Sequence, residues 1–519
     1  MEIGDKMRRL GRFLLKFLKM LFSRYLIILI LFILQIAFIW LVVSLLQQYY
    51  WWVRLAFYLI EIIIFFHIMN KKEAPDFKIP WIIIFFIFPV IGLVIWLFFR
   101  NHRLKRSHLR KLTEMDLMLY PYFKTNDKER NQMNVDIPEY VTHFNYLENL
   151  THFKSYNDSH IEYFKTGESY FLDMINEMKK AKEFIYIEFF IIHRGKLFDR
   201  VHEILKEKVK EGVDVRILLD DIGSSGYMNH FYMQKLRHEG IKVHAFNKVI
   251  PIMSGIYNNR DHRKIVIIDH IAAYTGGCNM ADEYANMITR FGYWKDTGCK
   301  IQGPAMNNLI ALFLSLYQIE VKDVPDYKKI FDYQYETYNE GGYIYPFGDG
   351  PKPFYNELIG EGNYLNLINN AKKSVYISTP YLIPTYSLIN AIRNAALRGV
   401  DIKIMLPGIP DKKLPYSMAK NYFKYLTDAG VKIYLYKKGF NHNKCVLVDS
   451  KIAFNGTINF DYRSLVHHFE CGVLMVNTPC IKDIEEDFIQ TFNECELVIN
   501  PKKRFGLLLT LANLFAPLF

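Results

Sequence analysis

Two stretches of the chain repeat one pattern of residues that can do chemistry. The first is DHRKIVIID at 261–269 and the second is NHNKCVLVD at 441–449, and both read H-x-K-x4-D. After six further residues each continues as G-[GT]-x-N, which adds Asn279 and Asn459 to the pattern. Chance does not account for two copies of so long a pattern, so we interpret them as two parts of one site.

The residue types suit a phosphate group. Side chains alternate across a strand, so His262 and Lys264 are expected on one face, at the entrance of the buried run Ile265–Ile268. His442 and Lys444 repeat this arrangement. An imidazole can attack phosphorus or pass a proton, while an ammonium group holds negative charge. For one copy alone, a polar strand end with a solvated lysine is the alternative; the second copy argues against it.

An internal duplication extends beyond the motifs. AKEFIYIEFFII at 181–192 matches AKKSVYISTPYLI at 371–383, and each is followed by a helix, a strand, and a further helix and strand before the motif. Strands alternating with helices predict an α/β fold with parallel sheets. We expect two similar halves, at 158–303 and 345–497, packed as a pseudo-dimer. The other predicted segments are a basic N-terminal segment at 1–24, a membrane region at 25–99, a basic juxtamembrane linker at 100–157, a connector at 304–344 and a hydrophobic amphipathic tail at 498–519.

The N-terminal region is predicted to be a transmembrane α-helical region. Tyr25–Leu46 is apolar and long enough to cross a bilayer, whereas Trp51–Met69 and Trp81–Phe99 are interrupted by polar residues or by Pro and Gly. Two or three hydrophobic segments are therefore expected, and we favour the third as re-entrant or monotopic, because three full crossings would put the two basic flanks on opposite sides. Lys and Arg crowd both 1–24 and 100–111, which predicts a cytoplasmic amino terminus and a cytoplasmic catalytic domain. The apolar tail predicts a helix at the membrane interface or, alternatively, one packed on the catalytic core.

Composition narrows the partners. The 519 residues carry a net charge of +12, which suits an anionic partner such as phospholipid or nucleic acid. The excess lies beside hydrophobic segments, which favours lipid and a membrane. The six cysteines form no CxxC pair, and no Walker P-loop, GxGxxG or HExxH motif occurs. We therefore expect no cofactor and no metal.

The paired motifs resemble the HKD motifs of the phospholipase D superfamily, over roughly residues 135–500. LLDDIGSSG at 218–226, DYRS at 461–464 and the apolar stretch at 76–99 are similar to bacterial cardiolipin synthases within it. His468 departs from that family, where an Asn is expected before the Phe-Glu pair.

This resemblance implies a reaction. One motif histidine attacks phosphorus to form a phosphohistidine, and the other protonates the leaving alcohol and then activates an acceptor alcohol. Analogy with relatives favours His262 as the nucleophile. The implied substrates are phosphatidylglycerol and other anionic phospholipids in the bacterial cell membrane, with no nucleic acid; two phosphatidylglycerols would give cardiolipin and glycerol. A membrane-anchored phospholipase D or other phosphodiester hydrolase, a nuclease and a non-catalytic scaffold are alternatives, and a homo-oligomer is left open.

The resemblance also gives roles to the remaining site residues. The predicted catalytic set is His262, Lys264, Asp269, His442, Lys444 and Asp449. The two aspartates lie about 20 Å along the strand from the histidines, so we expect them to serve structure. Asn279 and Asn459 would bind phosphate oxygens. Asp296 and Glu470, each before the next apolar strand, are predicted to orient the histidines, with surface acids as the alternative.

Overall fold

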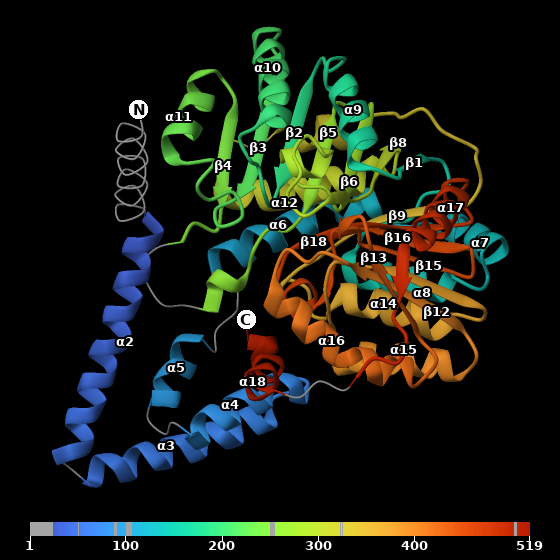
Figure 1. The fold of residues 1–519 in the computed structure, drawn as a ribbon. Coiled ribbons are helices and arrows are strands. Elements are labelled where there is room, and N and C mark those ends of the chain that lie inside the picture. The colour runs from blue at the N-terminus through green and yellow to red at the C-terminus, as the bar shows by residue number, and fades with distance from the viewer. Residues whose placement is uncertain are drawn as a thin grey trace, which may run out of the picture. The chain divides into compact units, whose positions relative to one another are not determined.

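The computed structural model describes residues 24–49, 51–87, 91–99, 106–249, 255–321, 323, 325–502 and 506–518. The predicted basic segment 1–24 therefore lies outside the described residues except for Arg24, as do 100–105 of the basic stretch. The chain divides into two compact units, one with residues 1–102 and 249–257 and one with almost all of the rest. Figure 1 shows the elements of both units, and each unit is described by itself.

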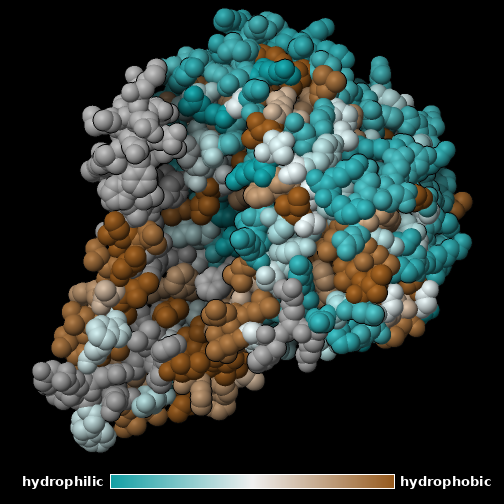
Figure 2. All heavy atoms as spheres, viewed as in Figure 1, coloured by the Kyte–Doolittle hydropathy of each residue, from teal (hydrophilic) through white to brown (hydrophobic). Residues whose placement is uncertain are grey.

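The N-terminal unit consists of helices with apolar surfaces. They are α2 (Arg24–Tyr49), α3 (Trp51–Asn70), α4 (Pro75–Ile87) and α5 (Ile91–Phe99). Large apolar side chains are exposed along them, among them Trp52, Ile63 and Phe86, and Figure 2 shows these helices mostly in the hydrophobic colour. Among the described residues, none of the helices has the combined length and hydropathy of a bilayer-crossing segment. The predicted membrane spans are thus not confirmed.

The larger unit is built on two sheets. The first has the strand order β1-β8-β6-β5-β2-β3-β4, and the second has β19-β13-β12-β10-β15-β16-β18-β9. The strands of the first sheet are β1 (His160–Phe164), β2 (Phe184–Phe189), β3 (Asp214–Asp220), β4 (Lys242–Phe246), β5 (Lys264–Ile268), β6 (Ala272–Gly276) and β8 (Gly298–Gln302). Those of the second are β9 (Tyr343–Asp349), β10 (Ser374–Ser378), β12 (Asp401–Pro407), β13 (Lys432–Tyr436), β15 (Cys445–Val448), β16 (Ile452–Gly456), β18 (Glu470–Val476) and β19 (Cys495–Leu497).

The two sheets have the same topology. Read from β4, the first sheet matches the second from β13 strand for strand, with β19 added outside. The expected α/β fold with two similar halves is therefore present, and the expectation of parallel sheets holds for part of each sheet only: β2, β3 and β4 pair in parallel, as do β10, β12 and β13. The motif strands β5 and β15 run antiparallel to both of their neighbours. The reason is local: tight turns at Asp269 and Asp449, both with left-handed backbone, return the chain at once into the next strand, and such a turn permits only antiparallel pairing.

Helices cover the outer face of each sheet. The first is covered by α9 (Gly167–Met178), α10 (Lys196–Lys210) and α11 (His230–His238), and the second by α8 (Val141–Thr151), α14 (Ile359–Asn370), α15 (Tyr386–Leu397) and α16 (Lys413–Thr427). The inner faces pack on each other through a third core, to which α12 (Met306–Glu320) and α17 (Cys480–Asn493) contribute. Every residue of β5 is buried, because Ile265 and Ile267 enter this inner core while Val266 and Ile268 enter the outer one. Burial on both faces explains the unbroken run of β-branched residues.

Two of the predicted segments contain helices in the structure. The predicted linker contains α6 (Arg106–Phe123), α7 (Asp127–Asp136) and α8. Leu112, Met115 and Leu119 recur at helical spacing and are buried where α6 packs on α12, a pattern that the charge run obscured. The predicted connector contains α12 and α13 (Tyr327–Phe331), and α12 follows β8 as α17 follows β18. Helix α12 contacts β9, the edge strand of the second half, and α17 contacts β1, the edge strand of the first half.

Candidate active site

The motif histidines lie where the two halves meet. The His262 amide donates to the carbonyl of Phe469 at 2.9 Å, and the Phe469 amide donates to the carbonyl of Arg260 at 2.8 Å. In the other half, β14 (Gly439–Asn441) pairs in parallel with β7 (Tyr293–Lys295), and the His442 amide donates to the Lys295 carbonyl at 2.8 Å. Backbone hydrogen bonds therefore attach each histidine to the segment of the opposite half that precedes its acid.

The histidines and acids pair across the halves. Nδ1 of His262 lies 2.9 Å from both carboxylate oxygens of Glu470, and Nδ1 of His442 lies 2.7 Å from Oδ2 of Asp296. All four side chains are buried. The structure thus brings Asp296 and Glu470 to the histidines, as the sequence predicted, but gives each acid the histidine of the other half. No sequence signal indicated this exchange.

The two acids differ in their other contacts. Glu470 also accepts hydrogen bonds from the hydroxyls of Thr457 and Ser464. The position equivalent to Thr457 in the first copy is Gly277, where a Cβ would come within 2.0 Å of the Asp296 carboxylate. The difference between Gly277 and Thr457 at this motif position therefore has a structural reason. Glycine makes room for one acid, and threonine donates a hydrogen bond to the other.

These contacts give the two histidines and the two acids different pKa values. Burial lowers the pKa of His262 to about 3, against the opposing charge of Glu470. Burial alone would raise the pKa of Glu470, but His262 and His468 hold it below its usual range. The pair is then a neutral imidazole and a carboxylate, so Nδ1–H donates and Nε2 keeps its lone pair. Burial raises the pKa of Asp296 to about 7, and burial with Lys444 lowers the pKa of His442.

The two lysines are buried beside the histidines. Nζ of Lys264 donates to the carbonyl of His262 at 2.6 Å. Nζ of Lys444 donates to the carbonyl of His442 and lies 2.8 Å from its Nδ1. Burial lowers the pKa of Lys264 to about 8 and that of Lys444 to about 7. Both can still carry the positive charge that an anion entering the site would stabilise.

The predicted phosphate ligands are placed unequally. The Asn279 amide donates to the Tyr284 hydroxyl at 2.7 Å and its oxygen accepts from the Ile191 amide at 3.2 Å. Asn459 is buried, and its side-chain oxygen has no hydrogen-bond partner among the described residues. The backbone amide of Asn459 donates to the Ser464 hydroxyl at 3.1 Å. Asn459 is therefore the one of the two whose side-chain oxygen awaits a partner.

The motif aspartates lie at the far ends of the motif strands. The Asp269 carboxylate accepts from the amides of Lys182, Glu183 and Phe184 at 2.7–2.9 Å. The Asp449 carboxylate accepts in the same way from the amides at 372, 373 and 374, at 2.7–2.8 Å. Each acid thus ties the turn after its motif strand to the start of the neighbouring strand. The structure brings neither aspartate to the histidines.

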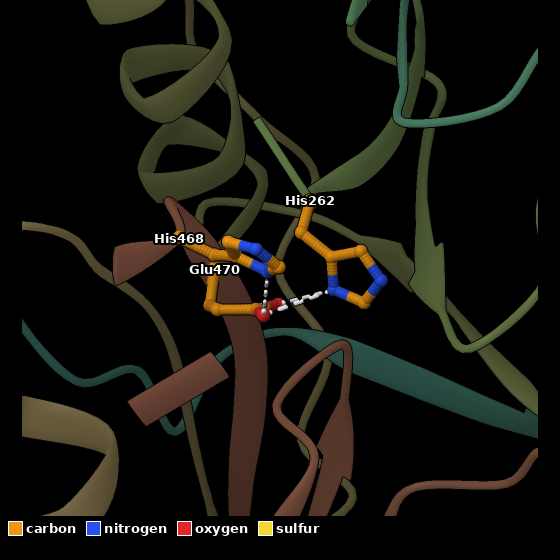
Figure 3. A group of neighbouring side chains, drawn as sticks. All are labelled: His262, His468 and Glu470. Atoms are coloured by element: carbon orange, nitrogen blue, oxygen red, sulfur yellow. Dashed lines mark hydrogen bonds and ion pairs between the residues drawn. The ribbon is translucent and has the colours of Figure 1, made fainter. Parts of the chain in front are cut away.

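Three donors near the first motif form a group that could hold a metal. Figure 3 shows His262, His468 and Glu470, whose ligand atoms lie within 4.8 Å of one another. Nδ1 of His468 lies 3.6 Å from Glu470, and its ring stands 5.4 Å from that of His262. Two imidazoles and a carboxylate are a donor set that Zn²⁺ accepts. The 2.9 Å contacts of His262 with Glu470 have the length of hydrogen bonds, and we interpret them so, whereas His468 lies at ion-pair distance from Glu470.

Sequence reasoning missed the residues that hold the first motif in place. The buried Asp220 carboxylate accepts from Nε of Arg260 at 2.9 Å and from the Asp261 amide at 3.0 Å. In the same loop, Ser224 donates to the Phe190 carbonyl, and the Phe190 ring packs 5.0 Å from that of His262. LLDDIGSSG was noted only as a resemblance; its signal was an acid and a serine next to an apolar strand.

Comparisons with known proteins agree with this geometry. The family model described as "Cardiolipin synthase, PLD-like domain" matches residues 174–289 and 364–492, and "Phospholipase_D-nuclease N-terminal" matches 59–101. A cardiolipin synthase of Clostridium perfringens strain SM101 is 34% identical over 82% of this chain and 90% of its own length. The chain belongs to the cardiolipin synthase family of the phospholipase D superfamily.

Other members and a solved structure are similar as well. Cardiolipin synthase 2 of Bacillus cereus is 33% identical over 82% of this chain and 83% of its own length. An uncharacterized protein of Streptococcus mutans is 38% identical over 83% of this chain and 93% of its own length. The crystal structure of phosphatidylserine synthase from Haemophilus influenzae matches 69% of this chain and 92% of its own, with 15% identity and a TM-score of 0.54. That last likeness supports the fold.

The DYRS signature of the family has a structural explanation here. The Asp461 carboxylate accepts from the Ser464 amide at 2.9 Å and so starts the turn at Arg463–His467. This turn directs the Ser464 hydroxyl to Glu470. The signature therefore supports the acid that holds His262.

Glu470→Gln and Asp296→Asn are each expected to lower kcat by about 10²–10⁴-fold with little change in KM, because the first removes the ionised acceptor of His262 and the second removes the carboxyl that changes protonation beside His442. Steady-state kinetics measures both constants. Glu336→Gln, at an exposed acid of the larger unit, is the matched control. A rise in KM at unchanged kcat would mean that the acids bind substrate instead.

Asp269→Ala is expected to destabilise the fold by about 2–4 kcal/mol, because three amides lose a charged acceptor. Asp449→Ala should cost less, since Asp449 and two of its amides are more exposed. Denaturant unfolding with Glu336→Ala as control measures the difference. Normal stability combined with a large loss of turnover would place these aspartates in the chemistry.

Proposed function

We propose that this chain is a cardiolipin synthase that transfers a phosphatidyl group from one phosphatidylglycerol to another and releases glycerol. The observation that carries the proposal is the pair of buried histidines, each hydrogen-bonded at Nδ1 to an acid of the opposite half. Membership of the family supplies the reaction class. The exchange replaces one phosphodiester by another, so the chemistry needs no energy-rich cofactor.

The first step is attack by His262 on the donor phosphate. Its Nδ1–H is held by the ionised Glu470, which leaves the Nε2 lone pair for phosphorus and stabilises the cation that forms. Lys264 and Lys444 offset the negative charge that grows on the phosphate oxygens. His442 is neutral because its pKa is lowered; it gives the proton of Nε2 to the glycerol oxygen as the P–O bond breaks and takes up a proton at Nδ1 from the protonated Asp296, and a phosphatidyl-histidine remains.

In the second step the proton at His442 moves in the opposite direction. His442 takes a proton from the hydroxyl of the second phosphatidylglycerol, and that oxygen displaces His262 from phosphorus. Asp296, with its pKa raised to about 7, and Lys444, with its pKa lowered to about 7, both change protonation near neutral pH beside His442. This environment suits a residue that must give and take a proton in one cycle.

A membrane location follows from the substrates. The helices α2 to α4 expose many large apolar side chains, and the N-terminal family model covers part of α3 and all of α4 and α5. We propose that this unit attaches the enzyme to the bacterial cell membrane. The charge distribution on both sides of the apolar runs favours a cytoplasmic catalytic unit. A site at the bilayer also keeps water from the phosphatidyl-histidine.

The product assay tests the proposed reaction. Purified enzyme with glycerol-labelled phosphatidylglycerol should release labelled glycerol and form cardiolipin. His262→Ala and His442→Ala should each lower turnover by at least about 10³-fold, because both histidines act on one phosphate. His238→Ala, an exposed histidine of α11, is the control. Phosphatidic acid without cardiolipin would identify a hydrolase, and turnover in both motif variants would exclude the two-histidine mechanism.

Cysteine accessibility tests the proposed sidedness. In a Cys495→Ser background, which removes the one cysteine that is not fully buried, Lys128→Cys on α7 should react with an impermeant maleimide only after the cells are permeabilised. A cysteine at Gln47, between the first two apolar runs, should react in intact cells. Labelling of Lys128→Cys in intact cells would place the catalytic unit outside.

A further inference from the structure

A cavity in the larger unit is lined by none of the motif histidines. It has a volume of about 510 Å³ and lies between residues 381–383, the start of α16, the turn at 461–463 and the C-terminal helix α18 (Leu507–Phe515). Its walls are mostly apolar and include Leu414, Met418, Leu511, Ala512 and Phe515. An apolar cavity of this size beside a polar site is a common form of ligand pocket.

The cavity is connected to the active site through one short segment. Residues 461–463 line it, and the next residue, Ser464, donates to Glu470, which holds His262. The positive charge of Lys412, which also lines the cavity, contributes to the lowered pKa of His442. The cavity wall is thus adjacent in sequence to a residue that bonds the acid of His262, and one of its cations affects the pKa of His442.

The rim carries the opposite charge to a phospholipid headgroup. Lys412 and Arg463 are both exposed at the cavity, and Nζ of Lys412 stands 5.7 Å from the centre of the Tyr381 ring. Of the two acids nearby, Asp411 accepts the Tyr381 hydroxyl at 2.7 Å and Asp461 accepts the Ser464 amide. The acids are therefore engaged in hydrogen bonds to the walls, while the two cations that line the cavity are exposed.

Helix α18 gives the cavity an apolar edge. Leu507 is 71% exposed and Leu508 is 83% exposed, and Leu511 lies partly in the cavity and is 38% exposed. The chain just after the helix is bonded to the turn at Arg463–His467, because Nε2 of His467 donates to the Pro517 carbonyl at 3.2 Å. The sequence predicted either an interface helix or one packed on the core. In the structure α18 packs against α16 and still presents leucines to its surroundings.

We propose that this cavity is the acyl-chain site of the anionic phospholipid that acts as acceptor, with α18 as its lipid-facing wall, Lys412 and Arg463 at its phosphate, and its free hydroxyl directed towards His442. The inference rests on the proposed function, whose substrates are lipids. The apolar walls take the chain, the cations take the charge, and the turn at 461–463 leads the headgroup towards the histidines. Exposed leucines on α18 allow a chain to enter from the bilayer without crossing water.

Filling the cavity should separate long-chain from short-chain substrates. Ala512→Trp is expected to lower kcat/KM for dioleoyl phosphatidylglycerol by about 10-fold or more, equivalent to about 1.4 kcal/mol, and to change that for soluble dihexanoyl phosphatidylglycerol less than about 2-fold. Thr510→Trp, at an exposed position on the same helix, is the matched control and should leave both unchanged. Equal losses for both lipids, or no loss for either, would overturn the acyl-chain site.

A binding experiment tests the lipid site independently of the proposed reaction. Phosphatidylglycerol with a diazirine at the chain terminus should, on irradiation in mixed micelles, label the peptides of α16 and α18 in the unaltered enzyme. The same labelling is expected in His442→Ala, which would bind lipid without turning it over. Labelling confined to other peptides would overturn the site even if cardiolipin is made. Labelling of α16 and α18 without any cardiolipin would support the lipid site and reject the proposed transfer.

Discussion

The structure depends on the exchange of acids between the two halves. His262 is held by Glu470 and His442 by Asp296, and all four groups are buried at the junction of the sheets. Neither half contains a complete histidine–acid pair. Loss of either histidine while the halves stay packed would leave a buried carboxylate without its partner, which costs several kcal/mol. The shared inner core, with α12 and α17 each reaching the edge strand of the other half, keeps the halves at the spacing that the pairs require.

The site is nearly symmetric, and its asymmetry has a physical origin. Thr457 and Ser464 donate to Glu470, whereas Gly277 leaves only room for Asp296. One acid is held ionised, and the pKa of the other is raised towards neutral pH. A reaction with one nucleophile and one proton carrier needs such a difference, because equal environments would give both histidines the same task. In this duplicated fold, the change between Gly277 and Thr457 and the presence of Ser464 provide the difference.

Much of this was predictable from the sequence, for identifiable reasons. The repeated spacing of His262, Lys264 and Asn279 with its second copy predicted one paired site, and the run at 265–268 predicted a strand buried on both faces. The antiparallel motif strands were not predicted, because helix–strand alternation indicates the order of elements and not the tight turn at Asp269. The crossed pairing was missed because equivalent positions in two copies look the same whether contacts form within or between them.

Other features are invisible to pattern reading. The salt bridge of Arg260 with Asp220 joins residues 40 apart in sequence and places the strand end that carries His262. The helix α6 was concealed by its basic residues, although Leu112 and Met115 keep the spacing of a buried face. The cavity beside α18 is formed by four distant segments, and only the fold brings them together.

The most direct test of the two-histidine account is to trap the covalent intermediate. Enzyme mixed with phosphatidylglycerol labelled at its phosphate is quenched in alkali within the first turnover, digested and mapped by mass spectrometry. The account predicts an adduct on His262 that carries the phosphate label through an alkali-stable, acid-labile P–N bond and is absent from His262→Ala and from Glu470→Gln at the same time point. A label on His442 would reverse the assigned roles, and quantitative turnover with no labelled histidine would contradict the covalent mechanism itself.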